Sequence, residues 1–201
     1  MATPEAKQAT RREVGRRITA LPRAERTVRS QAACRHLVQA PELAEARTVL
    51  LYAPLPDELD VWPAVRALAA TGKRLFLPKC QPEERGLLCV EVADFRRDLA
   101  RGAFNILEPR SDQGVGPAEL DVVVAPGRAF DGAGRRVGRG AGYYDRLFGR
   151  PDFRAFICGA AFDCQIFEQV PAGPHDVPVD AIVTESGLVR TARSRPARTD
   201  E

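Results

Sequence analysis

The sequence predicts an α/β fold in a single domain, with a mostly parallel sheet and helices on both faces. Short runs rich in valine, isoleucine and leucine alternate with segments of helical spacing. Each run is apolar throughout rather than at every second residue, as in strands that are buried on both faces. The length of 201 residues and the 44% hydrophobic content are sufficient for one sizeable core.

Two helices are expected before the first strand. Residues 7–20 can form a helix that ends at Leu21-Pro22, and a second helix is expected from Arg23 to Gln39, before Pro41. Residues 1–29 also hold most of the basic excess, with eight basic and three acidic side chains. Such a segment is typical of a solvated helix face, although it can also contact phosphates.

Six apolar runs of strand length follow. They span residues 47–54, 73–78, 86–92, 121–126, 154–162 and 180–185. A helix is expected within residues 62–72, where Gly72 ends the pattern, and a helical turn within residues 94–100. Ligands of open α/β sheets bind at the carboxyl ends of the strands, so the site is expected in the segments that follow the strands. These segments begin after Pro54, Pro78, Pro126 and Phe162.

Residues 1–189 are expected to form the domain, and the polar residues 190–201 to form a disordered tail. The chain has no apolar run of the roughly 20 residues that a membrane helix needs, and its first residues have no apolar signal core. These features predict a cytoplasmic protein without a membrane partner. A basic N-terminus also occurs in organelle transit peptides, but Glu5 and Glu13 interrupt it here.

The five cysteines are dispersed and include no C-x-x-C pair, which predicts reduced core residues rather than disulfides. A zinc site of Cys158, Cys164 and His175 is a weak alternative, because their spacing matches no common ligand pattern. Only 6% of the residues are aromatic and no RNA-binding signature occurs, so nucleic acid is an unlikely partner.

The most informative segment is PGRAFDGAGRRVGRGAGYYDRLF, residues 126–148, which contains six glycines and five arginines. Gly138, Gly140 and Gly142 alternate, so the backbone can bend and present N–H groups to an anion. A helix expected to begin near Tyr143 adds its positive end. The segment therefore predicts a phosphate-binding loop, with a flexible glycine-rich surface loop as the alternative.

Two common nucleotide motifs are excluded. The chain contains no Gly-Lys-Ser or Gly-Lys-Thr, which a Walker loop requires. Tyr143 and Asp145 stand where a Rossmann fingerprint would need its third glycine. Arg136 and Arg139 supply forked charge to the predicted loop, and Asp145 is a carboxylate suited to Mg²⁺.

The string at residues 126–148 resembles the signature of the 5-formyltetrahydrofolate cyclo-ligases, also called 5,10-methenyltetrahydrofolate synthetases. Weaker matches follow the order of that family over most of the chain. They are KQATR at 7–11, APLPDELDV at 53–61, GKRLFLPK at 72–79, GAFNILEP at 102–109 and GAAFDCQIFEQVPAGPHDVPVDAIVTE at 159–185. The resemblance implies a fold similar to that of sugar-phosphate isomerases and CoA transferases.

The resemblance also implies an activity. The family converts 5-formyltetrahydrofolate and ATP into 5,10-methenyltetrahydrofolate, ADP and phosphate, with Mg²⁺. A formamide oxygen is a poor leaving group, so it attacks the γ-phosphate and becomes an iminium phosphate before N10 closes the ring. The protein is then expected to position reactants and neutralise charge, as a monomer that binds small molecules.

Site residues are carried over where this sequence matches the family. The resemblance implies catalytic roles for Arg139 and Tyr143 and Mg²⁺ ligation by Asp145 and Asp180. It implies ATP contacts for Lys7, Arg11, Arg136, Val137, Gly138, Arg139, Gly140, Ala141, Gly142, Tyr143 and Tyr144. It implies folate contacts for Glu58, Arg139, Gly140, Ala141, Gly142 and Tyr143.

Structural roles remain open for several of these side chains. Lys7 and Arg11 fit a solvated helix face, Glu58 a solvated charge, Tyr143 a buried core position, and Asp180 a cap or strand-end carboxylate.

The sequence also departs from the family pattern. Val61 stands where threonine is frequent, Gly173 where glutamate is frequent, and Thr10 where leucine is common. These departures leave open a non-catalytic paralogue that binds a folate or nucleotide, or an RNA-associated module. A kinase-like or isomerase-like enzyme acting on a sugar phosphate is a third hypothesis.

Overall fold

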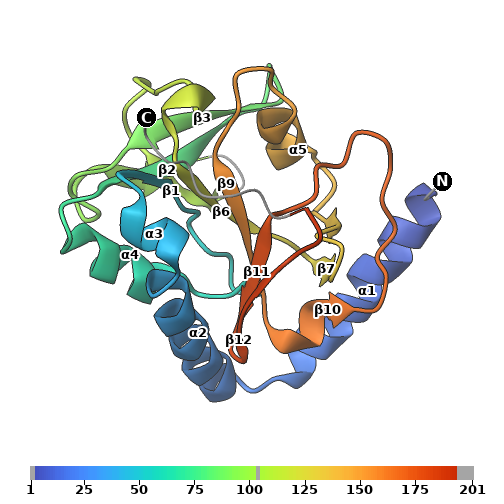
Figure 1. The fold of residues 1–201 in the computed structure, drawn as a ribbon. Coiled ribbons are helices and arrows are strands. Elements are labelled where there is room, and N and C mark those ends of the chain that lie inside the picture. The colour runs from blue at the N-terminus through green and yellow to red at the C-terminus, as the bar shows by residue number, and fades with distance from the viewer. Residues whose placement is uncertain (1–2, 103–104, 194–201) are drawn as a thin grey trace.

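The computed structural model describes residues 3–102 and 105–193, and a seven-stranded sheet forms its centre (Figure 1). Across the sheet the strands are β12 (Gly187–Arg190), β11 (Ala181–Thr184), β9 (Phe156–Ala160), β6 (Val122–Pro126), β1 (Thr48–Leu50), β2 (Arg74–Gln81) and β3 (Gly86–Glu91). The five inner strands run parallel to one another, and β12 and β3 at the two edges are antiparallel. The predicted α/β class with a mostly parallel sheet is confirmed.

Helices cover one face of this sheet. They are α2 (Arg23–Val38), α3 (Pro41–Glu45) and α4 (Trp62–Ala69), which lie together on one side in Figure 1. Val122 and Val124 of β6 belong to the apolar cluster that includes these helices. The helix predicted from Arg23 to Gln39 is α2, which ends one residue earlier at Val38. Helix α3 is an additional element that the sequence pattern does not predict.

The other face packs against α5 (Tyr143–Phe148) and against a small second sheet. Val123 of β6 belongs to this cluster, because successive strand residues point to opposite faces. The burial of both faces explains why β6 is apolar at every position from Val122 to Ala125. Burying each such side chain contributes on the order of 1.5–3 kcal/mol.

The small sheet has the order β10 (Ile166–Phe167), β7 (Ala129–Asp131) and β8 (Arg136–Val137). The N-terminal helix α1 (Pro4–Ala20) packs on this sheet and not on the central one: Val14 and Ile18 contact a cluster with Ala129, Val137 and Val170. The strands of the small sheet are only two or three residues long, so they produce no apolar run from which a strand could be predicted.

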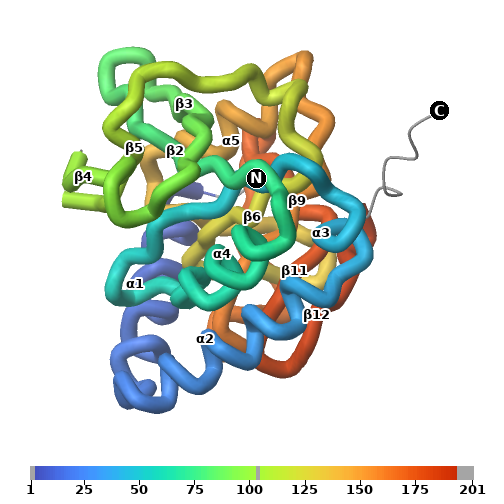
Figure 2. Tube along the Cα trace, turned by 90° about the vertical axis from the view of Figure 1, so that its left-hand side faces the viewer, coloured from blue at the N-terminus to red at the C-terminus, as the bar shows by residue number. Residues whose placement is uncertain are grey.

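One expected element is shorter than predicted. The helical turn predicted within residues 94–100 is limited to residues 94–98, where Asp98 N donates to the Asp94 carbonyl at 2.8 Å; the next residues form β4 (Leu99–Arg101), which pairs with β5 (Leu107–Pro109). The Asp98 carboxylate accepts hydrogen bonds from the backbone N–H groups of Ala93 and Asp94, which closes the turn before a helix can continue. Figure 2 shows the β4–β5 hairpin at the margin of the molecule, and β5 lies beside β2.

The predicted domain boundary stays a prediction. Arg190 is the last residue of β12, and the buried Thr191 hydroxyl donates to the Val179 carbonyl at 2.6 Å, so both residues pack with the domain. Residues 194–201, most of the expected tail, lie outside the described residues. Among the helices of the described ranges, none has the length and apolar character needed to cross a membrane.

The turn between β7 and β8 offers a test of backbone strain. Gly134 has a φ of +81°, and a Cβ there would lie 2.3 Å from the Val179 carbonyl oxygen. Gly134→Ala is expected to lower the free energy of unfolding by about 1–3 kcal/mol, measured by urea denaturation. Gly132→Ala in the same turn is the control, because a Cβ at Gly132 meets no atom within 4 Å. Equal stability of the two variants would contradict this account.

Candidate functional site

A cavity of about 420 Å³ lies at the carboxyl ends of β1, β2 and β6. Its wall includes Tyr52 and Glu58 from the segment after β1, Cys80 near the end of β2, and Gly127 directly after β6. The cavity is therefore at the end of the sheet where the sequence predicts a site. The segment immediately after Phe162 does not line it; the next lining residue in that direction is Asp176.

The glycine loop, residues 138–142, forms one side of the cavity. Gly140 and Gly142 have φ values of +116° and +70°, which other residues rarely adopt. The five backbone N–H groups of this loop donate no hydrogen bond to any residue in the described ranges. They are therefore available to an anion.

The glycine loop is held by two arginines through its carbonyl groups. Arg11 Nε of α1 donates to the Gly138 carbonyl at 2.8 Å, and Arg146 Nη2 of α5 donates to the Ala141 carbonyl at 2.6 Å. Both ends of the loop are thus fixed while its N–H groups stay unpaired. Such preorganisation lowers the cost of binding a charged group.

Most of the residues predicted to contact ATP, folate or Mg²⁺ lie together in the structure. The cavity is lined by Lys7, Arg11, Glu58, Arg136, Gly138, Arg139, Gly140, Ala141, Gly142, Tyr143, Tyr144 and Asp145. Val137 and Asp180 are the two selected residues that do not line it.

Val137 is buried behind the glycine loop. Its side chain is 1% exposed and packs with Val14 and Ile18 of α1, while its carbonyl accepts a hydrogen bond from Arg128 N at 2.7 Å. The expected ATP contact therefore does not fit the side chain of Val137, which instead supports the loop from the core.

Asp180 lies at the opposite end of the sheet from the cavity. It precedes β11, which runs parallel to β9 and β6, so it is at the amino end of its strand. Its buried carboxylate accepts a hydrogen bond from Ile157 N at 2.9 Å and faces Arg193 Nε at 3.9 Å. The expected Mg²⁺ role of Asp180 does not fit this place; it is a strand-end carboxylate.

The buried Arg136 and the half-buried Asp145 form an ion pair at the base of the cavity, with Arg136 Nη2 2.8 Å from Asp145 Oδ1. Arg136 Nη1 also donates to the Pro126 carbonyl at 3.2 Å, and its guanidinium lies 5.7 Å from the Tyr144 ring centroid. The Arg136 side chain is 3% exposed, so its charge is satisfied mainly within the protein. Burial raises the pKa of Tyr144, and the hydroxyl remains protonated.

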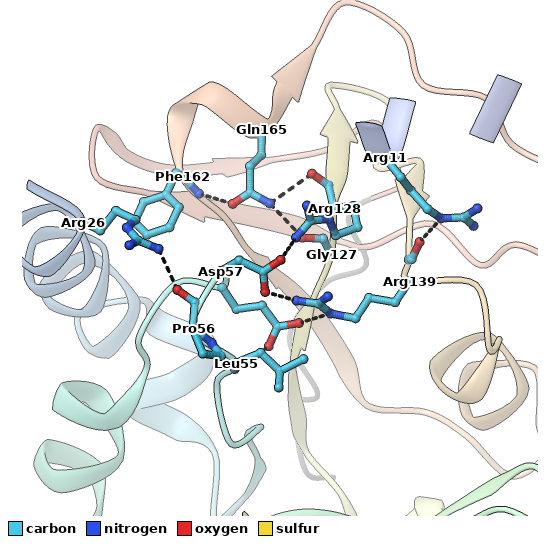
Figure 3. A network of polar contacts seen from close by, with 12 residues as sticks. Arg11, Arg26, Leu55, Pro56, Asp57, Gly127, Arg128, Arg139, Phe162 and Gln165 are labelled. Atoms are coloured by element: carbon cyan, nitrogen blue, oxygen red, sulfur yellow. Dashed lines mark hydrogen bonds and ion pairs between the residues drawn. The ribbon is translucent and has the colours of Figure 1, made fainter. Parts of the chain in front are cut away.

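The side chain of Arg139 extends from the glycine loop to the segment after β1 (Figure 3). Its Nε donates to Glu58 Oε1 at 2.8 Å, and its Nη2 pairs with Asp57 Oδ1. The other Glu58 oxygen accepts a hydrogen bond from Leu55 N at 3.0 Å. Burial alone would lower the pKa of Arg139, but Glu58 and Asp57 raise it overall, so the guanidinium stays charged.

Another ion pair, between α1 and the segment before β11, also lines the cavity. Lys7 Nζ of α1 pairs with Asp176 Oδ2, and the same oxygen accepts a hydrogen bond from Gly173 N at 2.7 Å. A Cβ at Gly173 would lie 3.7 Å from Lys7 Nζ, so the position without a side chain is beside this pair. The other departure, Val61, is fully buried in the core and does not line the cavity.

The remaining wall of the cavity was not predicted. It is apolar, with Leu87, Ile106 and Leu107 beside Tyr52. They come from three separate parts of the chain, the segment after β1, strand β3 and the start of β5, so no single stretch of sequence marks this wall. The cavity can therefore hold a polyanion along the glycine loop and a flat, partly apolar group against the opposite wall.

Two further polar groups lie in this wall. Burial, with the nearby Glu108 carboxyl, raises the pKa of Cys80 to about 12, so it is a neutral thiol rather than a nucleophile. Glu108 is buried and accepts a hydrogen bond from Cys80 N at 3.3 Å. Within the described ranges no three His, Cys, Asp or Glu side chains cluster to hold a metal. A cation here would need ligands from a bound molecule as well.

Comparison with known proteins identifies the group to which this site belongs. A model of the 5-formyltetrahydrofolate cyclo-ligase family matches residues 3–185. The chain belongs to this family. The resemblance deduced from residues 126–148 is thereby confirmed.

The cyclo-ligase relatives cover most of the chain. The 5-formyltetrahydrofolate cyclo-ligase of Escherichia coli K12 is 34% identical over 85% of this chain and 95% of its own. The mitochondrial 5-formyltetrahydrofolate cyclo-ligase of Arabidopsis thaliana is 28% identical over 91% of this chain and 75% of its own. The NMR structure of Aquifex aeolicus 5,10-methenyltetrahydrofolate synthetase superimposes with a TM-score of 0.82 at 34% identity, covering 96% of each chain.

The structural role of Asp180 is testable. Asp180→Ala leaves the buried Ile157 N–H without its acceptor and is expected to lower the free energy of unfolding by about 1–3 kcal/mol, measured by urea denaturation. Asp152→Ala is the control, since Asp152 pairs with Arg150 on the surface. A change in Asp180→Ala no larger than that in the control would show that this carboxylate does not hold the sheet together.

Proposed function

We propose that this protein cyclises 5-formyltetrahydrofolate to 5,10-methenyltetrahydrofolate with ATP, releasing ADP and phosphate. The observation that supports the proposal most is the row of unpaired N–H groups in the glycine loop, which faces an apolar wall across one cavity. The loop suits a triphosphate and the wall suits a reduced pteridine. Membership of the cyclo-ligase family joins these two features in one reaction.

The reaction requires activation of a formamide oxygen. That oxygen attacks the γ-phosphorus of ATP as the bond to the ADP oxygen breaks, and the product is an iminium phosphate. N10 then attacks the formyl carbon and loses its proton, and the carbon–oxygen bond breaks to release phosphate. No step needs a protein nucleophile, and the protein contributes positioning and positive charge.

The residues of the cavity divide between the two substrates. We assign the triphosphate to the N–H groups of the glycine loop, with Lys7 and Arg11 nearby, and the transition-state charge to Arg139. Tyr143 packs near the folate ring. Glu58 accepts pterin N–H groups, since a carboxylate oxygen that already accepts from Arg139 Nε has a second lone pair.

Mg²⁺ fits the donors at the base of the cavity. Asp145 Oδ1 accepts from Arg136, and Asp145 Oδ2 receives no hydrogen bond from the described residues. Mg²⁺ is commonly held by one or two carboxylates together with substrate phosphates and water. Asp145 is therefore the proposed protein ligand, and the ion would supply neutralising charge to the phosphates. The monomeric state and the cytoplasmic location remain predictions.

The purified protein is expected to convert 5-formyltetrahydrofolate into the strongly absorbing methenyl product, with ADP formed in step. Omitting ATP, or removing Mg²⁺ with a chelator, should stop both signals. Folate binding without ATP turnover would favour a non-catalytic binding protein. Stimulation of ATP hydrolysis by a sugar phosphate, and not by formylfolate, would favour a kinase-like or isomerase-like enzyme.

Arg139→Ala is expected to cost about 2–4 kcal/mol of transition-state stabilisation, because it removes a charge fixed beside the reacting groups. The measurement is kcat/KM for both substrates. Arg74→Ala is the matched control, since Arg74 also pairs with a carboxylate, Glu91, but on the surface at the edge of the sheet. Turnover of Arg139→Ala equal to that of the control would remove Arg139 from the catalytic site.

A further inference from the structure

The guanidinium of Arg139 is held on one edge by two carboxylates from adjacent residues. Glu58 Oε1 accepts from Nε, and Asp57 Oδ1 accepts from Nη2 (Figure 3). A single hydrogen bond to Nε would leave the planar group free to pivot, whereas two bonds along one edge fix its plane. For the third nitrogen, Nη1, no acceptor occurs among the described residues, so the remaining donors are available to a ligand.

Asp57 is itself fixed by a second arginine. Its Oδ2 lies 2.5 Å from Arg128 Nη1, so the carboxylate bridges Arg128 and Arg139. The Arg128 side chain is 9% exposed, whereas that of Asp57 is 42% exposed. Because a nearly buried guanidinium without a partner lowers the stability of the fold, the Arg128–Asp57 ion pair is expected to remain formed.

The main chain at Arg128 is anchored in the core. Its N–H donates to the Val137 carbonyl at 2.7 Å, and its carbonyl accepts from Gln165 Nε2 at 3.0 Å. The same Gln165 nitrogen donates to the Gly127 carbonyl at 2.8 Å, and Gln165 Oε1 accepts from Phe162 N at 2.8 Å. Figure 3 shows this continuous series of contacts from the buried glutamine to the cavity.

We propose that Asp57, anchored by Arg128, is a positioning residue that sets the orientation of Arg139 toward the phosphates. The role given to Arg139 depends on the proposed function. The contacts that link Arg128, Asp57 and Arg139, called the relay below, do not depend on it. Asp57 remains charged at neutral pH: burial alone would raise its pKa, and the hydrogen bonds and charges of Arg139 and Arg128 lower it overall.

The proposal distinguishes Asp57 from its neighbour Glu58. Glu58 lines the cavity and can contact a substrate, whereas Asp57 does not line it and acts through Arg139. Loss of Asp57 should therefore affect the chemical step that uses Arg139 more than substrate binding. Arg128→Gln should also slow this chemical step, because it removes the ion pair that holds Asp57 in place.

The first experiment compares Asp57→Asn with the wild type. The kcat is expected to fall by about tenfold or more, with the KM for folate changed by less than about threefold. In the Arg139→Ala background, Asp57→Asn should change kcat by less than about twofold, because a positioning residue has no effect once its target is absent. Arg128→Lys should recover most of the activity lost in Arg128→Gln, since lysine can still pair with Asp57.

A second readout does not depend on turnover. The Nε–Hε resonance of Arg139 in a ¹⁵N NMR spectrum should be protected from exchange in the wild type and should broaden or exchange faster in Asp57→Asn. Arg190→Gln is the matched control, because Arg190–Glu42 is also a pair of one buried and one half-exposed side chain, away from the cavity. Its melting temperature should fall at least as much as that of Asp57→Asn, while its kcat and its Arg139 resonance stay unchanged.

The outcomes separate the two proposals. If the wild type converts no formylfolate, the proposed function fails, and the Arg139 resonance still decides whether the relay exists. An unchanged resonance in Asp57→Asn overturns the relay. An unchanged kcat, or an equal fall in kcat with and without Arg139, overturns the role of Asp57 in the reaction. If Asp57→Asn does not fold, Arg128→Gln tests the same relay by the same two readouts.

Discussion

The backbone of residues 138–142 must stay open to an anion while the rest of the domain packs around it, and this constraint organises the site. A chain segment with unpaired N–H groups does not hold its shape through its own hydrogen bonds. Here the shape comes from outside the segment. Arg11 and Arg146 bind its carbonyls, the short strand β8 fixes its start, and the buried Val137 joins that start to the core beneath α1. The neighbouring residues hold the loop in place, and its own unpaired N–H groups remain able to donate hydrogen bonds to an anion.

The positive charges of the cavity are also held by residues from other parts of the chain. The cavity contains several cations close together, and three of them pair with carboxylates: Lys7 with Asp176, Arg136 with Asp145, and Arg139 with Glu58 and Asp57. Without ligand, these pairs limit the mutual repulsion of the cations. A triphosphate would then join an array that is already oriented, and little reorganisation would accompany its binding.

The sequence predicts the site well where its residues are contiguous. The glycines and arginines of residues 136–145 are informative because a loop that binds phosphate needs that composition in one short stretch. Val137 lies inside this stretch, so the sequence predicts an ATP contact for it, although its side chain packs in the core. Asp180 matches a metal-binding position of the family motif, although strand direction puts it at the other end of the sheet. Tyr52, Leu87 and Ile106 could not be predicted as cavity residues, because only the fold brings them together.

The docking of α1 on the small sheet has a consequence for how the protein is made. The apolar partners of α1 are Ala129, Val137 and Val170, which lie far later in the chain and are therefore synthesised after the helix. Until then its inner face, with Val14 and Ile18, has nothing to bury against. The nascent chain can assemble α2 and the early strands in the meantime, but α1 can dock, and bring Lys7 and Arg11 to the cavity, only after Val170 has been synthesised. The wall of the cavity that contains Lys7 and Arg11 is thus among the last parts of the domain to assemble.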